Sequence, residues 1–78
     1  MSFQIILVSD SRYEAIVAEV YINGKFVALV NQEYGLEQLE LEIAGTDVAQ
    51  EHVERRVNLN EFVAAVDHAC KRLRGEVP

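Results

Sequence analysis

The sequence predicts an α+β domain, an antiparallel meander of three or four strands with one C-terminal amphipathic helix packed on one face of the sheet. Three observations support this prediction. An Asn-Gly pair joins two runs rich in valine and isoleucine, residues 36–44 alternate apolar and polar side chains, and residues 59–73 carry an apolar stripe at helical spacing. Because the chain has 78 residues, we expect a single domain over residues 1–78.

The predicted strands begin with residues 3–8, which are apolar and end at a Ser-Asp-Ser cluster that favours a turn. Residues 13–22 and 25–32 form the central hairpin. Asn23 and Gly24 between them favour a type I′ turn, because both central residues of that turn need positive φ. A two-residue turn fixes the register and would place Val20 opposite Val27 and Ala18 opposite Leu29. Residues 36–44 are expected to form a half-buried strand that follows the hairpin. A short strand around residues 53–57 is an additional candidate.

This register divides the sheet into two largely apolar faces. We assign the helix to the face with fewer polar residues, which carries Ile16, Val20, Ile22, Val27, Leu29, Leu39, Leu41 and Ile43. The outer face then carries Val17, Glu19, Tyr21, Phe26, Val30, Glu40 and Glu42. Exposed apolar patches rimmed by polar groups are typical of interaction surfaces. The outer face is therefore expected to bind a partner or a second copy, unless strand 3–8 or segment 46–57 folds over it.

The C-terminal helix has recognisable ends as well as an apolar face. Its stripe consists of Leu59, Phe62, Val63, Val66, Ala69, Cys70 and Leu73. Asn58 is expected to cap the amide of Glu61 in a capping box, and Gly75 to end the helix in the left-handed conformation. Lys71, Arg72 and Arg74 lie near the C-terminal end, where positive charges interact favourably with the helix dipole.

Charge is distributed unevenly along the chain, which has thirteen acidic residues, seven Lys or Arg and a formal net charge of −6. Residues 1–54 contain ten acids and two bases, whereas residues 55–78 contain three acids and five bases. Residues 33–54 contain no Lys or Arg. Nucleic-acid binding depends on basic residues, so the acidity argues against it and favours a basic protein partner. The alternative is that the charge only keeps the protein in solution.

Groups of residues with catalytic or metal-binding spacing are not found, and we expect neither an enzyme nor a cofactor or metal site. His68 and Cys70 diverge by about 200° around the helix and cannot act as a nucleophile and base. Glu40 and Glu42 lie ~7 Å apart on one strand face, but exposed carboxylates both stay ionised. A single cysteine excludes an internal disulfide, and the first apolar run is too short for a signal peptide or membrane span. We therefore expect a cytoplasmic protein.

Two stretches of sequence and the C-terminal helix together resemble a known type of domain. They are Val-Ala-Glu-Val-Tyr-Ile-Asn-Gly-Lys-Phe-Val-Ala-Leu-Val at residues 17–30 and Leu-Glu-Leu-Glu-Ile at residues 39–43. Their layout across residues 3–74 resembles small bacterial domains of uncharacterised or immunity-protein type. The resemblance implies an intracellular acidic protein that blocks a basic toxin or nuclease by covering its active site.

The sequence therefore predicts a protein-binding module, immunity-like and directed to a basic partner. Aromatic anchors and a set of carboxylates are the expected contact residues. The alternative is a homodimeric structural or regulatory protein without chemistry of its own. The partner-binding residues expected are Tyr21, Phe26, Val17, Val30, Glu19, Glu37, Glu40, Glu42, Glu51 and Glu54.

Overall fold

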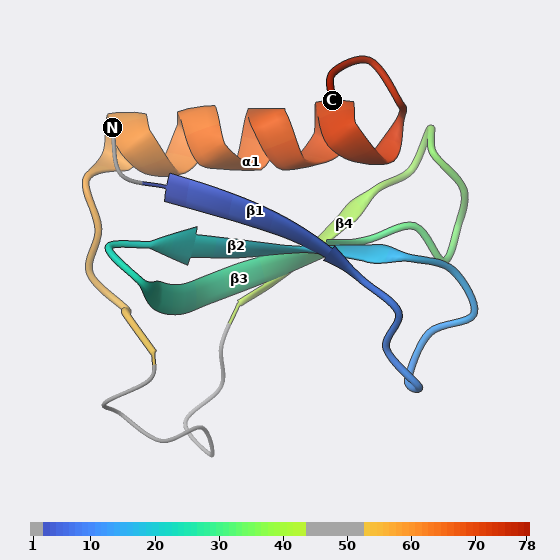
Figure 1. The fold of residues 1–78 in the computed structure, drawn as a ribbon, viewed down its shortest axis with the longest axis horizontal. Coiled ribbons are helices and arrows are strands. Elements are labelled where there is room, and N and C mark those ends of the chain that lie inside the picture. Colours follow the sequence, from blue (N-terminus) through green and yellow to red (C-terminus); the bar gives the residue numbers. More distant parts are fainter. Residues whose placement is uncertain (1–2, 44–52) are drawn as a thin grey trace.

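The computed structural model describes residues 3–43 and 53–78, which form one four-stranded sheet and one helix (Figure 1). The strands are β1 (Phe3–Val8), β2 (Val17–Ile22), β3 (Lys25–Asn31) and β4 (Glu40–Ile43), and the helix is α1 (Leu59–Leu73). The sheet order is β1-β2-β3-β4, and every neighbouring pair is antiparallel. The predicted meander with one C-terminal helix on the sheet is confirmed.

The turn between β2 and β3 has the backbone that its sequence predicts. Asn23 has a φ of 54° and Gly24 a φ of 80°, and both values are positive as a type I′ turn requires. Ile22 is opposite Lys25 and Tyr21 is opposite Phe26, also as predicted.

From Val20 back toward the start of β2, the predicted register between β2 and β3 is wrong by one residue. The β2–β3 pairing shifts between Val20 and Tyr21, so that Val20 lies opposite Ala28 and Ala18 opposite Val30. This is the effect of a β-bulge, in which two residues of one strand oppose one residue of the other. Both Val27 and Ala28 therefore contribute to the core under α1.

The bulge moves the side chains that follow it in β3, Leu29 and Val30 among them, to faces opposite to those predicted. Val30 now pairs with Ala18 and belongs to the core on the helix side, although it was predicted on the outer face. Leu29 pairs with Glu19 and Glu42, which places it on the outer face instead of the helix side. Side chains of directly paired residues share a face, so every residue after the bulge changes sides.

β4 is shorter than predicted, because it begins at Glu40 and not at residue 36. Glu40 pairs with Asn31, the last residue of β3, so residues before Glu40 have no β3 partner. Gly35 has a φ of 94°, and the Gln38 amide donates to its carbonyl in a turn. The short strand considered around residues 53–57 is limited to one parallel bridge between Val53 and Phe26.

α1 begins and ends at the predicted residues. The Asn58 side chain accepts a hydrogen bond from the Glu61 amide at 3.0 Å. At the other end, Gly75 has a φ of 74° and its amide donates to Arg72, while the Glu76 amide donates to Lys71. These two bonds form a Schellman motif.

The core lies between α1 and one face of the sheet. Its buried residues are Ile5, Ala18, Val20, Ile22, Val27, Ala28, Val30, Ala65 and Ala69, against which Phe3, Leu39, Val57, Phe62, Val66, Cys70 and Leu73 pack. Within the described ranges, α1 packs against β2 and β1, reaches β3 at a few positions and makes no close contact with β4 (Figure 1). The helix side of β4 is therefore not covered by α1.

Candidate protein-binding surface

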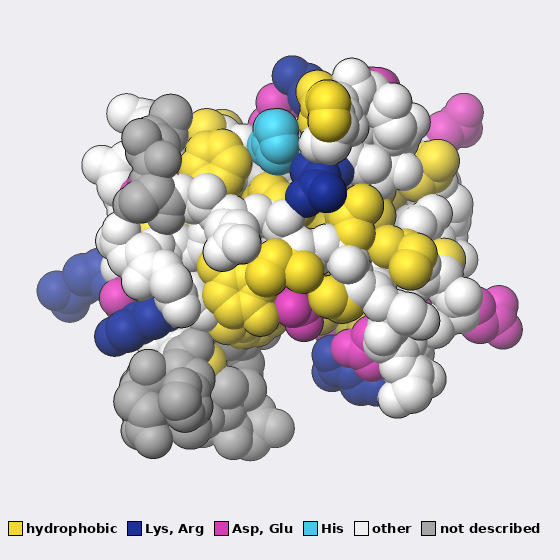
Figure 2. Space-filling view, viewed as in Figure 1, with side chains coloured by type: hydrophobic (Ala, Val, Ile, Leu, Met, Phe, Trp, Pro, Cys, Tyr) yellow, Lys and Arg dark blue, Asp and Glu magenta, His cyan; other side chains and the backbone are white. Residues whose placement is uncertain are grey.

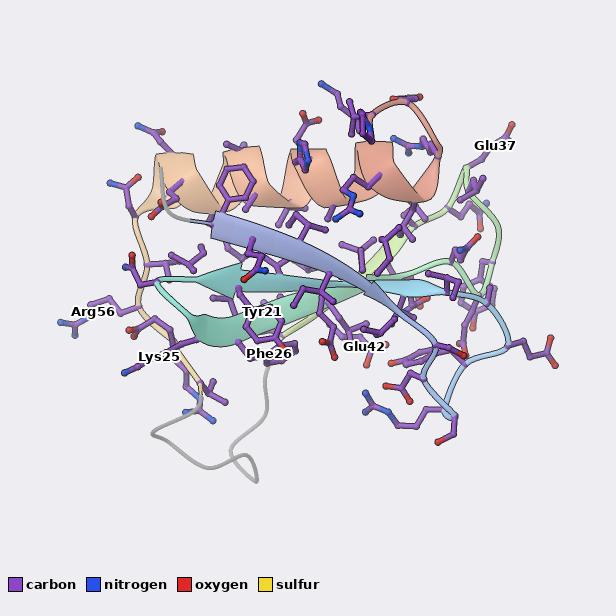
Figure 3. The ribbon with its side chains drawn as sticks, viewed as in Figure 1. Tyr21, Lys25, Phe26, Glu37, Glu42 and Arg56 are labelled. Carbon is purple, nitrogen blue, oxygen red and sulfur yellow. The ribbon has the colours of Figure 1, made fainter. Side chains whose placement is uncertain are left out.

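The outer face of the sheet, opposite α1, carries the predicted aromatic pair (Figure 3). The Tyr21 and Phe26 rings meet edge to face with centroids 5.8 Å apart, and both side chains are half-buried. The Tyr21 hydroxyl donates to Glu19 at 2.9 Å. Burial, and then this hydrogen bond, raises the pKa of Tyr21. The structure thus brings Glu19, Tyr21 and Phe26 together.

Two predicted contact residues, Val17 and Val30, do not reach the surface. Val17 is 0% exposed and Val30 is 2% exposed. Val30 lies under α1 because of the bulge, and Val17 is buried although its strand position is on the outer face. Their prediction as partner-binding residues fails because a partner cannot contact fully buried side chains.

A polar cluster that the sequence did not indicate crosses the outer face. The Tyr13 hydroxyl, in the loop between β1 and β2, donates to Glu42 on β4, and the Asn31 side-chain amide donates to the same Glu42 oxygen, Oε2, at 2.8 Å. Asn31 is only 1% exposed and also accepts from the Glu33 amide at 3.2 Å. The hydrogen bond to Glu42 and then burial raise the pKa of Tyr13 to about 12.

This cluster shows what covers one end of the outer face. The Tyr13 side chain reaches Glu42 on β4 from the β1–β2 loop, at the end of the outer face where Val17, Leu29 and Asn31 are buried. Strand β1 does not fold over this face, because it is the edge strand next to β2. Of segment 46–57, residues 46–52 lie outside the described residues, and Val53 lies beside β3 with the Glu54 amide donating to Phe26.

Three of the predicted carboxylates lie on β4 or in the turn before it. Glu37 and Glu40 are exposed and Glu42 is half-buried, while Glu33, which was not among the predicted contact residues, is also exposed. Figure 3 shows Glu37 at the end of the molecule opposite Lys25 and Arg56. Glu54 is half-buried beside Phe26, and Glu51 lies outside the described residues.

Two cations from other elements approach this acidic region. Arg74 donates to the Leu36 carbonyl at 3.3 Å. The Arg12 guanidinium lies 5.3 Å from the centre of the Tyr13 ring and pairs with Asp10 at 3.0 Å, and its hydrogen bonds lower the pKa of Asp10. Arg12 is thus already paired with an acid of its own loop.

An apolar groove between α1 and β4 is a second surface that the sequence did not predict. We call it the α1–β4 groove; its pocket has a volume of about 320 Å³ and is lined by Val27, Ile43, Glu54, Arg55, Val57, Leu59 and Phe62. Two of its lining side chains are largely exposed, Ile43 by 69% and Leu59 by 73%, and so are Leu41, two residues before Ile43 on β4, by 40%, and Val63, one turn after Leu59 on α1, by 57%. The strand alternation and the helical stripe predict all four in the core, because periodicity shows which side of an element is apolar but not how far the helix extends over the sheet.

A larger open hollow of about 610 Å³ lies between the β1–β2 loop and residues 32–34. Its lining includes Arg12, Tyr13 and Tyr34, and Gln32 closes one side by donating to the Ile16 carbonyl at 2.8 Å. Most of the side chains that line this hollow are exposed, and the cation among them, Arg12, pairs with Asp10.

Titratable groups on α1 serve the packing of the helix. Burial raises the pKa of the Cys70 thiol, and His68 lies beside Phe3 with ring centroids 5.8 Å apart. Asp67 and Lys71 form the surface ion pair that their spacing predicts, at 3.0 Å. In the described ranges, three or more His, Cys, Asp or Glu side chains do not gather in a metal-binding arrangement. The helix described here also lacks the length and hydropathy of a membrane span.

Comparison of the chain with protein families, with curated proteins and with solved structures found no match. A function for this chain is therefore inferred from its surfaces.

Proposed function

We propose that this protein is an acidic protein-binding module whose partner is a basic protein. The observation that carries the proposal is the acidity of residues 33–42, which contain the exposed Glu33, Glu37 and Glu40 and the half-buried Glu42 but no Lys or Arg. Such a field speeds association with a basic surface and opposes binding of acidic ones. The module acts by binding and not by catalysis, in the manner of an immunity-like inhibitor that covers a basic partner.

Apolar contact area next to the carboxylates supports this proposal. Exposed charges contribute mainly to association rate and specificity, so a stable complex also needs apolar side chains that lose water. Tyr21 and Phe26 on the outer face provide one such area, and the α1–β4 groove provides another. The aromatic pair lies on the same face of the sheet as Glu42, and the groove includes Ile43, the residue that follows Glu42.

Affinity capture from the lysate of the native host tests the proposal, with washes at low and high salt. The test variant is Glu37→Lys with Glu40→Lys, because both side chains are exposed and their replacement leaves the Tyr13–Glu42 contact in place. The matched control is Glu14→Lys with Glu76→Lys, which changes net charge equally at exposed acids elsewhere.

The proposal predicts a stoichiometric basic protein that the native chain and the control retain and the test variant loses. Equal capture by all three proteins would contradict the role of the acidic region. Recovery of this protein alone would contradict a separate partner.

A homodimeric structural or regulatory protein is the second candidate, and the composition of β1 favours it. This edge strand has no charged residue over Phe3–Val8, and hydrophobic side chains gather at the level of the sheet on the β1 side (Figure 2). Two copies could therefore pair through β1 without like charges facing each other. Against this candidate, Arg72 from α1 donates to the Ile5 carbonyl at 2.5 Å and occupies an acceptor of the strand. Light scattering over a concentration series distinguishes the candidates.

A further inference from the structure

We propose that the edge of β4 binds an extended partner segment in which apolar residues alternate with Lys or Arg, and that this segment adds a fifth strand to the sheet next to β4. The inference rests on the proposed function and names the class of partner segment. It combines three observations about the described residues: an edge strand with two different faces, an apolar groove beside one face, and carboxylates on the other.

Among the described residues, β4 has one neighbour in the sheet, β3, and its other edge is the end of the sheet. Edge strands present backbone N–H and C=O groups that an added strand can bind. Its side chains alternate strictly: Leu41 and Ile43 point to the helix side, and Glu40 and Glu42 point to the outer face. An added strand therefore meets apolar side chains on one face and carboxylates on the other.

The helix side of β4 has apolar side chains that the chain itself leaves exposed. α1 packs on β1 and β2, so its Leu59 and Val63, one turn apart, extend beyond the covered part of the sheet. The pocket that joins Leu59 and Phe62 to Ile43 shows that the helix and β4 border the same space. A fifth strand beside β4 would place its apolar side chains in this space.

The outer face of β4 determines the charge of the partner segment. Side chains directly opposite each other on neighbouring strands interact, and like charges in such pairs are destabilising. Lys or Arg side chains on the added strand would lie beside Glu40 and Glu42. Both donors to Glu42, Tyr13 and Asn31, bind its Oε2 atom, and they hold this carboxylate in position on the outer face.

The same charges argue against a second copy of this chain as the occupant. In a twofold antiparallel pair of β4 strands that keeps both helices on one side, opposing residues have the same orientation, so Glu40 faces Glu42 or one of the two glutamates faces its own copy. A parallel twofold pair would place each carboxylate beside Leu41 or Ile43. Charge thus selects a basic and apolar segment over self-pairing.

The test uses three short, capped, fluorescently labelled peptides and measures binding by anisotropy. In the first, lysine alternates with valine; in the second, the same residues are grouped in two blocks; in the third, glutamate replaces lysine. We expect the alternating lysine peptide to bind in a saturable manner and at least tenfold more tightly than the other two. Amide exchange of β4 should slow when this peptide is bound.

Two variants and one control separate the groove from general electrostatics. Leu59→Gln with Val63→Gln, and separately Glu40→Lys, should each weaken binding of the alternating peptide at least tenfold. The control is Leu7→Gln with Ile16→Gln, two side chains that are 38% and 42% exposed and lie outside the groove, and it should leave the affinity unchanged. Circular dichroism verifies that each variant is folded.

Each other result overturns the inference. Equal binding of the alternating and block peptides would mean general attraction to the carboxylates, which leaves the proposed function intact but removes strand addition. Absence of peptide binding would reject the β4 site, and the capture experiment would then decide the proposed function alone. Self-association that Glu40→Lys strengthens would identify a second copy as the occupant.

Discussion

Replacement of Tyr13 by phenylalanine tests the contact that crosses the outer face. The change deletes the hydroxyl that donates to Glu42 and keeps the ring, over which the Arg12 guanidinium lies at 5.3 Å. The contact joins residues 29 positions apart, so its loss should release the β1–β2 loop from β4. We therefore expect a lower free energy of unfolding with the sheet retained.

The size of the effect follows from the burial and charge of the pair. A hydrogen bond to a charged group contributes about 1.5–3 kcal/mol when buried, and this pair is partly solvated, so we expect Tyr13→Phe to cost about 1–2 kcal/mol. In a domain of this size, each kcal/mol lowers the melting temperature by roughly 4–8 °C. Glu42→Ala should cost more, because it also removes the acceptor of the buried Asn31 amide.

Urea unfolding of the two single variants, the double variant and the native chain provides a double-mutant cycle. We expect a coupling free energy of about 1–2 kcal/mol between positions 13 and 42, because Tyr13→Phe loses its effect once the carboxylate is absent. Tyr34→Phe is the control, since Tyr34 is 66% exposed, and it should not change stability. Additive effects of Tyr13→Phe and Glu42→Ala would refute the contact.

Three further predictions concern the turn, the helix cap and the response to high pH. Gly24→Ala should lower the free energy of unfolding in urea by about 1 kcal/mol, because φ is +80° although an added Cβ meets no atom within 4 Å; an unchanged midpoint would contradict the type I′ turn. Asn58→Ala should cost about 1 kcal/mol in the same assay and Asn58→Ser much less, since serine can still accept from the Glu61 amide; equal losses would argue against capping. The pKa of Tyr13 is raised to about 12 in the folded protein, whereas that of an unfolded tyrosine is near 10, so the unfolded chain loses this proton first. The free energy of unfolding that Tyr13 contributes should therefore be fully present below about pH 10 and decline between pH 10 and 12. The decline should be less steep in Tyr13→Phe.

Local sequence signals predicted the elements whose geometry is decided locally. Positive φ at Asn23 and Gly24 follows from the two residue types, and the ends of α1 follow from Asn58 and Gly75. Each of these features depends on backbone groups within a few residues, so the chain encodes it without reference to the rest of the fold.

The register and the faces could not be predicted in the same way. A strand of valine, alanine and leucine is apolar at every position, so the sequence of residues 27–30 contains no signal for the bulge at Val27. The bulge is favoured by packing, because it places both Val27 and Ala28 in the core under α1. As a result Val30 was predicted on the wrong face.

The candidate site was predicted in part for the same reason. The exposed glutamates and the pairing of Tyr21 with Phe26 follow from charge and from the hairpin turn. The contact between Tyr13 and Glu42, and the exposure of Leu59 beside Ile43, depend on which strands the loop and the helix cross. Periodicity identifies the apolar side of an element but not which other element packs against that side.

The measurement that tests the central claim most directly is the affinity of the captured basic protein for the purified chain, determined by calorimetric titration at several salt concentrations. The account predicts that affinity falls as salt rises, and that Glu37→Lys with Glu40→Lys weakens binding at least tenfold, about 1.4 kcal/mol, while Glu14→Lys with Glu76→Lys changes it less than about twofold. Equal affinity of the two variants for the partner would contradict the assignment of binding to the acidic β4 side of the sheet.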